Sequence, residues 1–199
     1  MELFQRIIFT LQKWYQYRHA LATVQDFHNC QLHQIAPAKL KTKATLILVL
    51  DFDGVLAAHG EIYPTPELHG WLTECVSIFG ADKIFILSNK PLPARIAYFN
   101  QHYPGVQYIA DVKKKPYPDG LQKIMALTGQ RAEALRLVDD RLLTGGLAAC
   151  IANVPMTYIS RPYVSLSKRP IKELFFMSLR FLERWLVPLL RLLPQKQTK

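Results

Sequence analysis

Short apolar runs alternate with stretches of helical periodicity along residues 44–160. The runs predict strands at 46–50, 83–87, 106–110, 135–138 and 156–159. Helical patterns lie between them: one starts at Thr65-Pro66-Glu67 and leads to Phe79, and the others lie at 94–102, 118–127 and 142–149. Runs that are apolar throughout are typical of strands buried on both faces, so the sequence predicts an α/β fold with a parallel sheet covered by helices on both sides. Ligands of such sheets bind beyond the carboxyl ends of the strands.

Both ends of the chain have amphipathic helical patterns. Apolar residues recur at helical spacing from Phe4 to Tyr15 and again from Phe175 to Leu193. Pro188 is expected to kink the second pattern, and charged residues interrupt it at Arg180, Glu183, Arg184 and Arg191. We therefore expect three parts: an N-terminal helical arm over 1–34, a central domain over 35–165, and a C-terminal helix and tail over 166–199.

The net charge of +10 belongs to the two ends of the chain. Residues 1–43 carry a net charge of +4 and residues 161–199 one of +7, whereas residues 44–160 carry −1. Basic amphipathic helices suit the interface of an anionic membrane, with Trp, Phe and Leu in the acyl boundary and Arg and Lys on the headgroups. The sequence leaves open the alternatives that both helices pack as core or serve oligomerisation. Nucleic acid is not an expected partner, because no recognisable binding module accompanies the charge.

Composition narrows the class of protein further. Half of the residues are hydrophobic, which excludes a disordered chain. Three widely spaced cysteines predict neither a disulfide framework nor a zinc cluster. The apolar runs at the termini predict neither a signal peptide nor a membrane-spanning helix. We expect a cytoplasmic protein that is peripheral on the inner face of a membrane.

Four polar motifs follow predicted strands. Two carboxylates follow the first strand, a Ser-Asn pair the second and a lysine cluster the third, and two adjacent carboxylates end the fourth. These motifs are Asp51-Phe52-Asp53-Gly54-Val55, Ser88-Asn89-Lys90, Lys113-Lys114-Lys115-Pro116 and Asp139-Asp140-Arg141. The carboxyl ends of parallel strands share one edge, so we expect the motifs to meet there. Carboxylates and a lysine suit phosphoryl transfer, in which a nucleophile must reach a phosphorus surrounded by negative oxygens that a metal ion and a lysine offset.

In order and spacing, these motifs resemble those of the haloacid dehalogenase (HAD) superfamily, whose members carry out Mg²⁺-dependent phosphoryl transfer through an aspartyl-phosphate. The resemblance implies a Rossmannoid sheet and a phosphatase activity. It implies that Asp51 is the nucleophile and that Asp53 protonates the leaving oxygen and later activates water. Ser88 and the residue after it, Asn89, would bind a phosphate oxygen. Lys115 is the expected phosphate-binding lysine, because the superfamily's lysine commonly precedes a proline.

The resemblance also implies a Mg²⁺ site. Asp51 and the backbone carbonyl of Asp53 would bind the ion, with Asp140 as a direct ligand and Asp139 in support; oxygen ligands of this kind suit Mg²⁺. Many relatives have a Gly-Asp pair here and a second Asp several residues later. In this chain the later position is Gly145 or Gly146, so the distal acid is absent, and the adjacent Asp-Asp pair matches another form of the motif.

The spacing of the motifs excludes a cap domain. The 36 residues between Asp51 and Ser88, and the 26 between Ser88 and Lys115, suffice only for one helix and one strand each. A capless member of the superfamily is expected to have an open site and to act on large substrates, or to obtain a lid from a partner.

A narrower resemblance is to the YqeG-like phosphatases of subclass IIIA, which include the mitochondrial phosphatidylglycerophosphate phosphatases. It is carried by residues 35–40, by the segment Asp140-Arg141-Leu142-Leu143-Thr144-Gly145-Gly146, and by Ser160-Arg161-Pro162. Relatives read Gly-Asp-Gln in the second segment and place the distal Asp at position 145. The expected substrate is a phospholipid-type phosphomonoester, phosphatidylglycerophosphate first. Two alternatives remain: a capless protein phosphatase, which would favour phosphopeptides, and a catalytically weak scaffold at a membrane.

Overall fold

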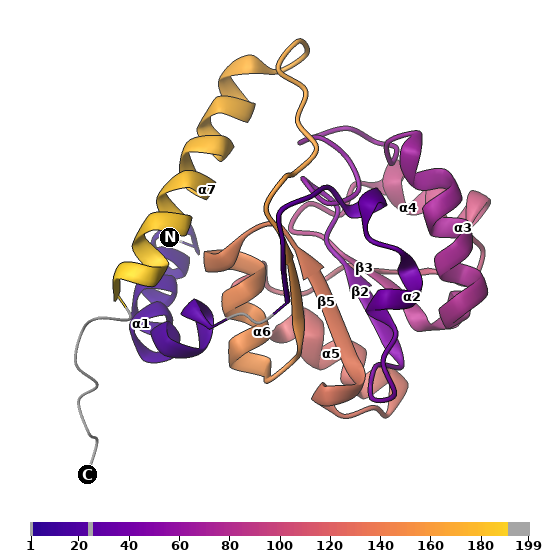
Figure 1. Ribbon diagram of the computed structural model, residues 1–199, viewed down its shortest axis with the longest axis horizontal. Helices are drawn as coiled ribbons and strands as arrows, with labels where there is room; N and C mark the ends of the chain where they lie inside the picture. Colours follow the sequence, from indigo (N-terminus) through magenta and orange to yellow (C-terminus); the bar gives the residue numbers. More distant parts are fainter. Residues whose placement is uncertain (1, 24–25, 191–199) are drawn as a thin grey trace.

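The computed structural model describes residues 2–23 and 26–190, whose centre is a parallel sheet of six strands in the order β1-β6-β5-β2-β3-β4 (Figure 1). The strands are β1 (Asp26–His28), β2 (Ile47–Leu50), β3 (Ile84–Leu87), β4 (Gln107–Ile109), β5 (Leu135–Asp139) and β6 (Met156–Ile159). From β2 the chain adds β3 and β4 on one side and then β5 and β6 on the other. The strand order therefore reverses between β2 and β5, which is where ligands of such sheets bind.

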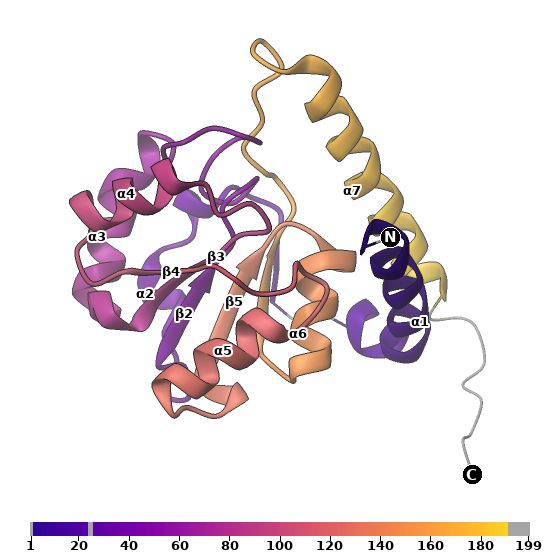
Figure 2. The same ribbon diagram turned by 180° about the vertical axis from the view of Figure 1, so that it is seen from behind.

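Alternate residues of each strand face two separate cores. In β2, Leu48 and Leu50 pack under α2 (Pro37–Leu40), α3 (Glu67–Phe79) and α4 (Pro93–His102). Ile47 and Val49 point to the opposite core, under α1 (Glu2–Ala22), α5 (Asp119–Thr128) and α6 (Leu147–Ala152) (Figure 2). Burial on both faces explains why the strands read as continuous apolar runs, since both sides of each strand lose contact with water.

Helix α7 (Pro170–Leu190) lies beside α1 at one side of the sheet, as Figures 1 and 2 both show. Unlike an ordinary surface helix, α7 turns charged side chains toward the domain and apolar side chains outward. Three charged residues of α7 are buried against the domain: Glu173, Arg180 and Glu183. We call the exposed apolar residues of α1 and α7 the terminal apolar face: Leu3, Phe4, Ile7, Ile8, Leu11, Tyr15, Ile171, Leu174, Phe175, Met177, Phe181, Leu182, Trp185, Leu186 and Leu189.

The structure confirms the α/β fold and the five predicted strands, and it corrects the ends of the chain. β1 lies within the expected N-terminal arm, yet it pairs with β6 as part of the sheet. The membrane interpretation placed Arg180 and Arg184 on lipid headgroups, but both contact the domain, as does Glu183. Pro188 lies inside the last described turn of α7, and Arg191 and Leu193 fall outside the described residues.

Four short helical turns complete the chain: Leu32–Gln34, Ala81–Lys83 and Ala132–Ala134, which are 3-10 turns, and Leu142–Gly146, a π-helical turn that opens into α6. Residues 142–149 were expected to form one helix, and the structure divides them between the π turn and α6. Among residues 2–23 and 26–190, no helix combines the length and the apolarity that crossing a membrane requires.

Candidate active site

The polar motifs meet at the carboxyl edge of the sheet. Asp51 directly follows β2, and Asp139 ends β5, its neighbour in the sheet. Lys115 reaches the same point from the loop between β4 and α5. Its Nζ lies 2.8 Å from Asp51 Oδ1 and 2.5 Å from Asp139 Oδ2. The structure thus brings the expected nucleophile, the expected lysine and one expected acid of the metal motif into direct contact at the reversal of strand order.

Burial and mutual repulsion control the ionisation of these groups. Burial raises the pKa of Asp51 to about 8, and the carboxylates of Asp139 and Asp140 add to the rise, while Lys115 opposes it. Burial also raises the pKa of Asp140 to about 6 against the effect of Arg180. The pKa of Lys115 is raised because Asp139 and Asp51 flank it, which outweighs its burial. With all three carboxylates ionised, the cluster would therefore hold more negative charge than Lys115 and Arg180 offset.

These residues fit a divalent cation. One carboxylate oxygen each of Asp51, Asp139 and Asp140 lies within 4.8 Å of the others, and all three residues are buried. Asp140 Oδ1 is buried with no hydrogen-bond partner among the described residues. Carboxylates are the ligands that hard divalent cations prefer, and a bound cation would supply the positive charge that the cluster lacks.

The pair after β3 supports the lysine loop. The side chain of Asn89 accepts a hydrogen bond from the Lys115 backbone N–H at 2.7 Å and donates one to the Lys115 carbonyl at 3.3 Å. Ser88 is buried, and its Oγ accepts a hydrogen bond from the Lys90 N–H at 3.1 Å. Asn89 therefore positions Lys115, a role that its place beside Ser88 did not predict.

Asp53 is held by an arginine that the sequence analysis missed. Arg95, on α4, donates two hydrogen bonds to the Asp53 carboxylate, at 2.7 Å and 3.0 Å, and its guanidinium lies 3.8 Å from the centre of the Phe52 ring. The Gly60 N–H donates a third bond to Asp53 at 3.0 Å. Although burial opposes the change, the bonds from Arg95 lower the pKa of Asp53. The carboxylate is therefore ionised in the neutral range.

Helix α7 reaches the same edge through Arg180. Its Nε lies 2.5 Å from Asp140 Oδ2, and the side chain is 2% exposed. Gly54 makes room for this contact: its φ is +92°, and a Cβ there would lie 2.5 Å from Asp140 Oδ2 and 2.8 Å from Arg180 Nη2. A side chain at position 54 is excluded both by its backbone conformation and by space.

Further contacts hold α7 against the site. Glu183 accepts a hydrogen bond from the Leu142 N–H at 2.9 Å and pairs with Arg141. Near the other end of the helix, Glu173 accepts a bond from the His59 N–H at 3.1 Å, and the His59 ring stacks on Phe176 with centroids 3.9 Å apart. These contacts fix α7 along the edge that carries the carboxylates.

The site is capless, as its spacing predicted, but it is not open. Asp51 is 7% exposed and Lys115 4%, while Asp139 and Asp140 are fully buried. The covering elements are α7 and the loop after β2, whose residues from Val55 to His59 are buried. The expected openness is thus corrected, because α7 and this loop bury the carboxylates and Lys115.

Gly145 packs directly on Asp139. A Cβ on Gly145 would lie 2.0 Å from Asp139 Oδ2. The Asp139 carboxylate therefore occupies the space that any side chain at position 145 would need. The aspartate at position 139 therefore requires a glycine at position 145.

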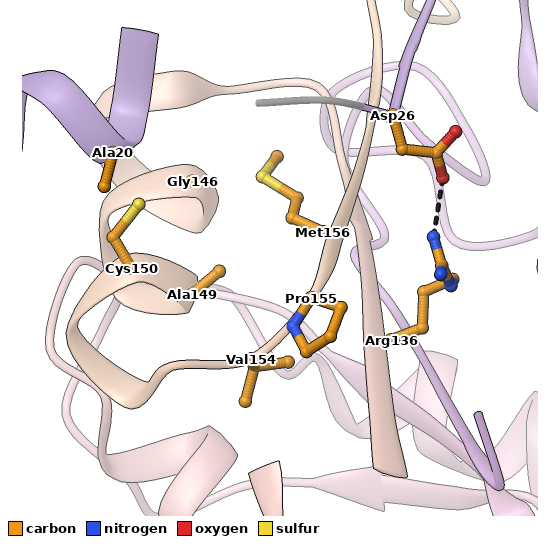
Figure 3. Close-up of a pocket in the computed structure, with 9 residues that line it drawn as sticks. All are labelled: Ala20, Asp26, Arg136, Gly146, Ala149, Cys150, Val154, Pro155 and Met156. Atoms are coloured by element: carbon orange, nitrogen blue, oxygen red, sulfur yellow. Dashed lines mark hydrogen bonds and ion pairs between the residues drawn. The ribbon is translucent and has the colours of Figure 1, made fainter. Parts of the chain in front are cut away.

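A cavity away from the carboxylates is lined by none of the expected site residues (Figure 3). Its volume is about 280 Å³, and its lining includes the ion pair of Asp26 and Arg136, 2.7 Å apart, with Cys150 and Met156. These residues stand near the amino ends of β1, β5 and β6. The cavity is thus at the opposite edge of the sheet from the carboxylates.

Sequence reasoning missed Arg95, Arg180 and Glu183. Each is a charged residue within an amphipathic helix, and such positions are usually solvent-facing. A signal for α7 was nevertheless present, because Glu173, Arg180 and Glu183 fall at helical spacing on one face with opposite charges. For Arg95 the sequence offers no comparable pattern.

Comparisons with known proteins give one structural likeness. No model of a protein family matches the sequence, and no curated protein matches it. The chain is similar to the cobalt-bound form of the deoxy-D-mannose-octulosonate 8-phosphate phosphatase from Haemophilus influenzae, at 12% identity and a TM-score of 0.40. The likeness covers 68% of this chain and 90% of that one.

Proposed function

We propose that this chain is a Mg²⁺-dependent phosphomonoester hydrolase of the HAD type. The observation that carries the proposal is the buried contact of Lys115 with Asp51 and Asp139 at the reversal of strand order. A carboxylate beside a lysine, with two further carboxylates for a cation, has the parts that phosphoryl transfer requires. The resemblance of the motifs to the superfamily supports the same reaction.

In the proposed reaction, Asp51 is the nucleophile. Its carboxylate oxygen bonds to phosphorus as the bond from phosphorus to the leaving oxygen breaks. The leaving oxygen takes a proton from water, because the Asp53 carboxylate is ionised. Water then attacks the phosphorus, the bond to Asp51 breaks, and inorganic phosphate leaves. The Lys115 ammonium would offset the charge of the phosphoryl oxygens, and Ser88 would bind one of them.

Asp51, Asp140 and the backbone carbonyl of Asp53 would hold Mg²⁺, with Asp139 in support. When bound, the ion offsets the charge of the phosphoryl oxygens and of the carboxylates around them. Asp53 would serve chiefly as the base of the second step, because its ion pair with Arg95 lowers its pKa and keeps it ionised.

The substrate that we propose is a phospholipid-type phosphomonoester, with phosphatidylglycerophosphate as the first candidate. The terminal apolar face supports it, with Phe4 and Trp185 each 68% exposed. The Phe9 ring of α1 stacks on Tyr117, two residues beyond Lys115, with centroids 4.2 Å apart, so the helix that carries part of this face adjoins the lysine loop. In this proposal the segments 1–34 and 166–199 place the domain over 35–165 on the cytoplasmic face of an anionic membrane.

The test is phosphate release from phosphatidylglycerophosphate in mixed micelles, from a soluble ester and from a phosphopeptide, with and without Mg²⁺. Metal-dependent turnover that favours the lipid and vanishes in Asp51→Asn is the expected result. Preference for the phosphopeptide would replace the lipid by a protein substrate. Folded protein that is silent on all three would support the scaffold and contradict the hydrolase.

A further inference from the structure

The guanidinium of Arg180 is buried with part of its hydrogen-bonding capacity unused. Nε donates to Asp140 at 2.5 Å, but neither Nη1 nor Nη2 has a hydrogen-bond partner among the described residues. Arg180 is 2% exposed, so water does not readily take these protons. Buried donors without partners are costly, and a guanidinium keeps its charge at every physiological pH. Such a group is suited to an anionic ligand.

Arg180 adjoins the carboxylate cluster. Arg180 holds Asp140, and a ligand oxygen of Asp140 lies within 4.8 Å of one of Asp51. Arg180 Nη2 also lies beside Gly54, within the loop that carries Asp51 and Asp53. A phosphoryl group bonded to Asp51 would therefore enter the same cluster as the guanidinium, whose planar donors match phosphate oxygens.

The contact with Asp140 leaves the cation site intact. Arg180 occupies Oδ2, whereas Oδ1 is without a partner among the residues that the structure describes. One carboxylate can thus orient the guanidinium with one oxygen and keep the other for a cation. This division argues against Arg180 as a substitute for the cation.

We infer that Arg180 is a phosphate-binding residue, which the C-terminal helix supplies to the active site in place of a cap. The inference rests on the proposed function, since the phosphate is that of the substrate of Asp51. It gives α7 two roles on opposite faces: the buried face binds phosphate through Arg180, and the exposed face is apolar.

The test measures the binding of inorganic phosphate by titration calorimetry at saturating Mg²⁺, for the full chain and for Arg180→Gln and Arg180→Lys. A hydrogen-bonded charge pair in a buried site is worth about a tenfold change or more in affinity. We expect Arg180→Gln to weaken phosphate binding by at least about tenfold and Arg180→Lys to weaken it less. In turnover assays the same order should appear in KM.

Arg184→Gln is the matched control. Arg184 lies one turn further along α7 and contacts the Tyr158 hydroxyl and the Ser160 carbonyl, outside the carboxylate cluster. Its replacement should loosen α7 to a similar degree without changing the affinity for phosphate. Unchanged affinity in a folded Arg180→Gln variant would overturn the inference, and so would an equal loss in Arg184→Gln. Tighter Mg²⁺ binding and faster turnover in Arg180→Gln would show instead that Arg180 competes with the cation.

The inference and the proposed function fail in different ways. Phosphate binding that depends on Arg180, in a protein that turns over no ester, would contradict the hydrolase and leave the phosphate site. Turnover that depends on Asp51 but not on Arg180 would support the hydrolase and contradict the role of Arg180.

Discussion

The carboxylate of Asp139 fills the space into which a side chain of Gly145 would project, with a built Cβ only 2.0 Å from Asp139 Oδ2. The resemblance to the HAD motif implies the reverse arrangement, with glycine at the first of these positions and aspartate at the second. We therefore expect the two forms to be related by a reciprocal exchange, in which the Asp139 carboxylate takes the place of an acid at position 145.

This exchange is testable by substitution. Gly145→Ala should lower the free energy of unfolding by about 2 kcal/mol, because the new Cβ displaces Asp139, and it should weaken Mg²⁺ binding. Gly145→Asp combined with Asp139→Gly should restore much of both. Gly70→Ala, at a helical glycine with nothing within 4 Å of the new atom, is the control and should not destabilise the protein. Thermal melts and Mg²⁺ titrations measure the effects, and a double variant no better than Gly145→Ala would contradict the account.

The raised pKa of Asp51 predicts how stability depends on pH. Without Mg²⁺ the folded chain holds this proton up to about pH 8, whereas the unfolded chain releases it near the ordinary aspartate pKa of 3.8. Between these limits the folded state binds more protons, so the Asp51 contribution to the free energy of unfolding falls as pH rises. Asp51→Asn should therefore exceed the natural protein in stability at pH 8 by about 1–4 kcal/mol and by little at pH 4.

Mg²⁺ should reverse that order, because it stabilises the ionised carboxylates of the natural protein. Urea unfolding at both pH values, with Mg²⁺ or with a chelator, measures all four cases. A natural protein that gains stability relative to Asp51→Asn on going from pH 4 to pH 8 without Mg²⁺ would show that Asp51 ionises easily.

The ion pair of Arg95 and Asp53 predicts a shift in the pH–rate profile. Arg95→Met removes the groups that lower the pKa of Asp53, so the acid limb of kcat/KM should move to higher pH. The variant should also lose about 3 kcal/mol of stability, because it leaves a largely buried carboxylate without its partner. Arg95→Lys keeps the charge and should shift the limb less. An unchanged profile in active Arg95→Met would remove Asp53 from the reaction.

The terminal apolar face predicts binding to anionic vesicles. Trp185→Glu should reduce the bound fraction, with a loss of about tenfold in affinity, because the replaced side chain is 68% exposed and free to enter the interface. Leu127→Glu on α5 changes a residue that is also exposed, at 58%, and is the control. Cosedimentation at low and high salt measures the effect. Equal binding of both variants would contradict the membrane proposal, and a dimer lost in Trp185→Glu would assign the face to oligomerisation.

The inner strands and the carboxylate cluster could be predicted from the sequence because their signals are local. Continuous apolar runs identify β2 and β3, and each ends directly on a motif. Asp139 ends β5, which pairs with β2, so the topology brings Asp51 and Asp139 together. β1 could not be predicted, since its three residues begin with Asp26 and end with His28. The packing of α7 could not be predicted for another reason. Its periodicity defines an apolar and a charged face, and the structure buries the charged face, which is the reverse of the usual case. Which face packs depends on partners such as Asp140 and Arg141, which are distant in sequence.

The central claim is that Asp51 attacks phosphorus, and it is tested most directly by detecting the phosphoryl-enzyme. The full chain would be mixed with Mg²⁺ and the preferred ester, quenched in acid during turnover, digested and examined by mass spectrometry. The account predicts a phosphoryl group on Asp51 in the natural protein and none in Asp51→Asn, which should bind Mg²⁺ less tightly and release no phosphate. A phosphoryl group on another residue, or steady turnover by Asp51→Asn, would contradict it.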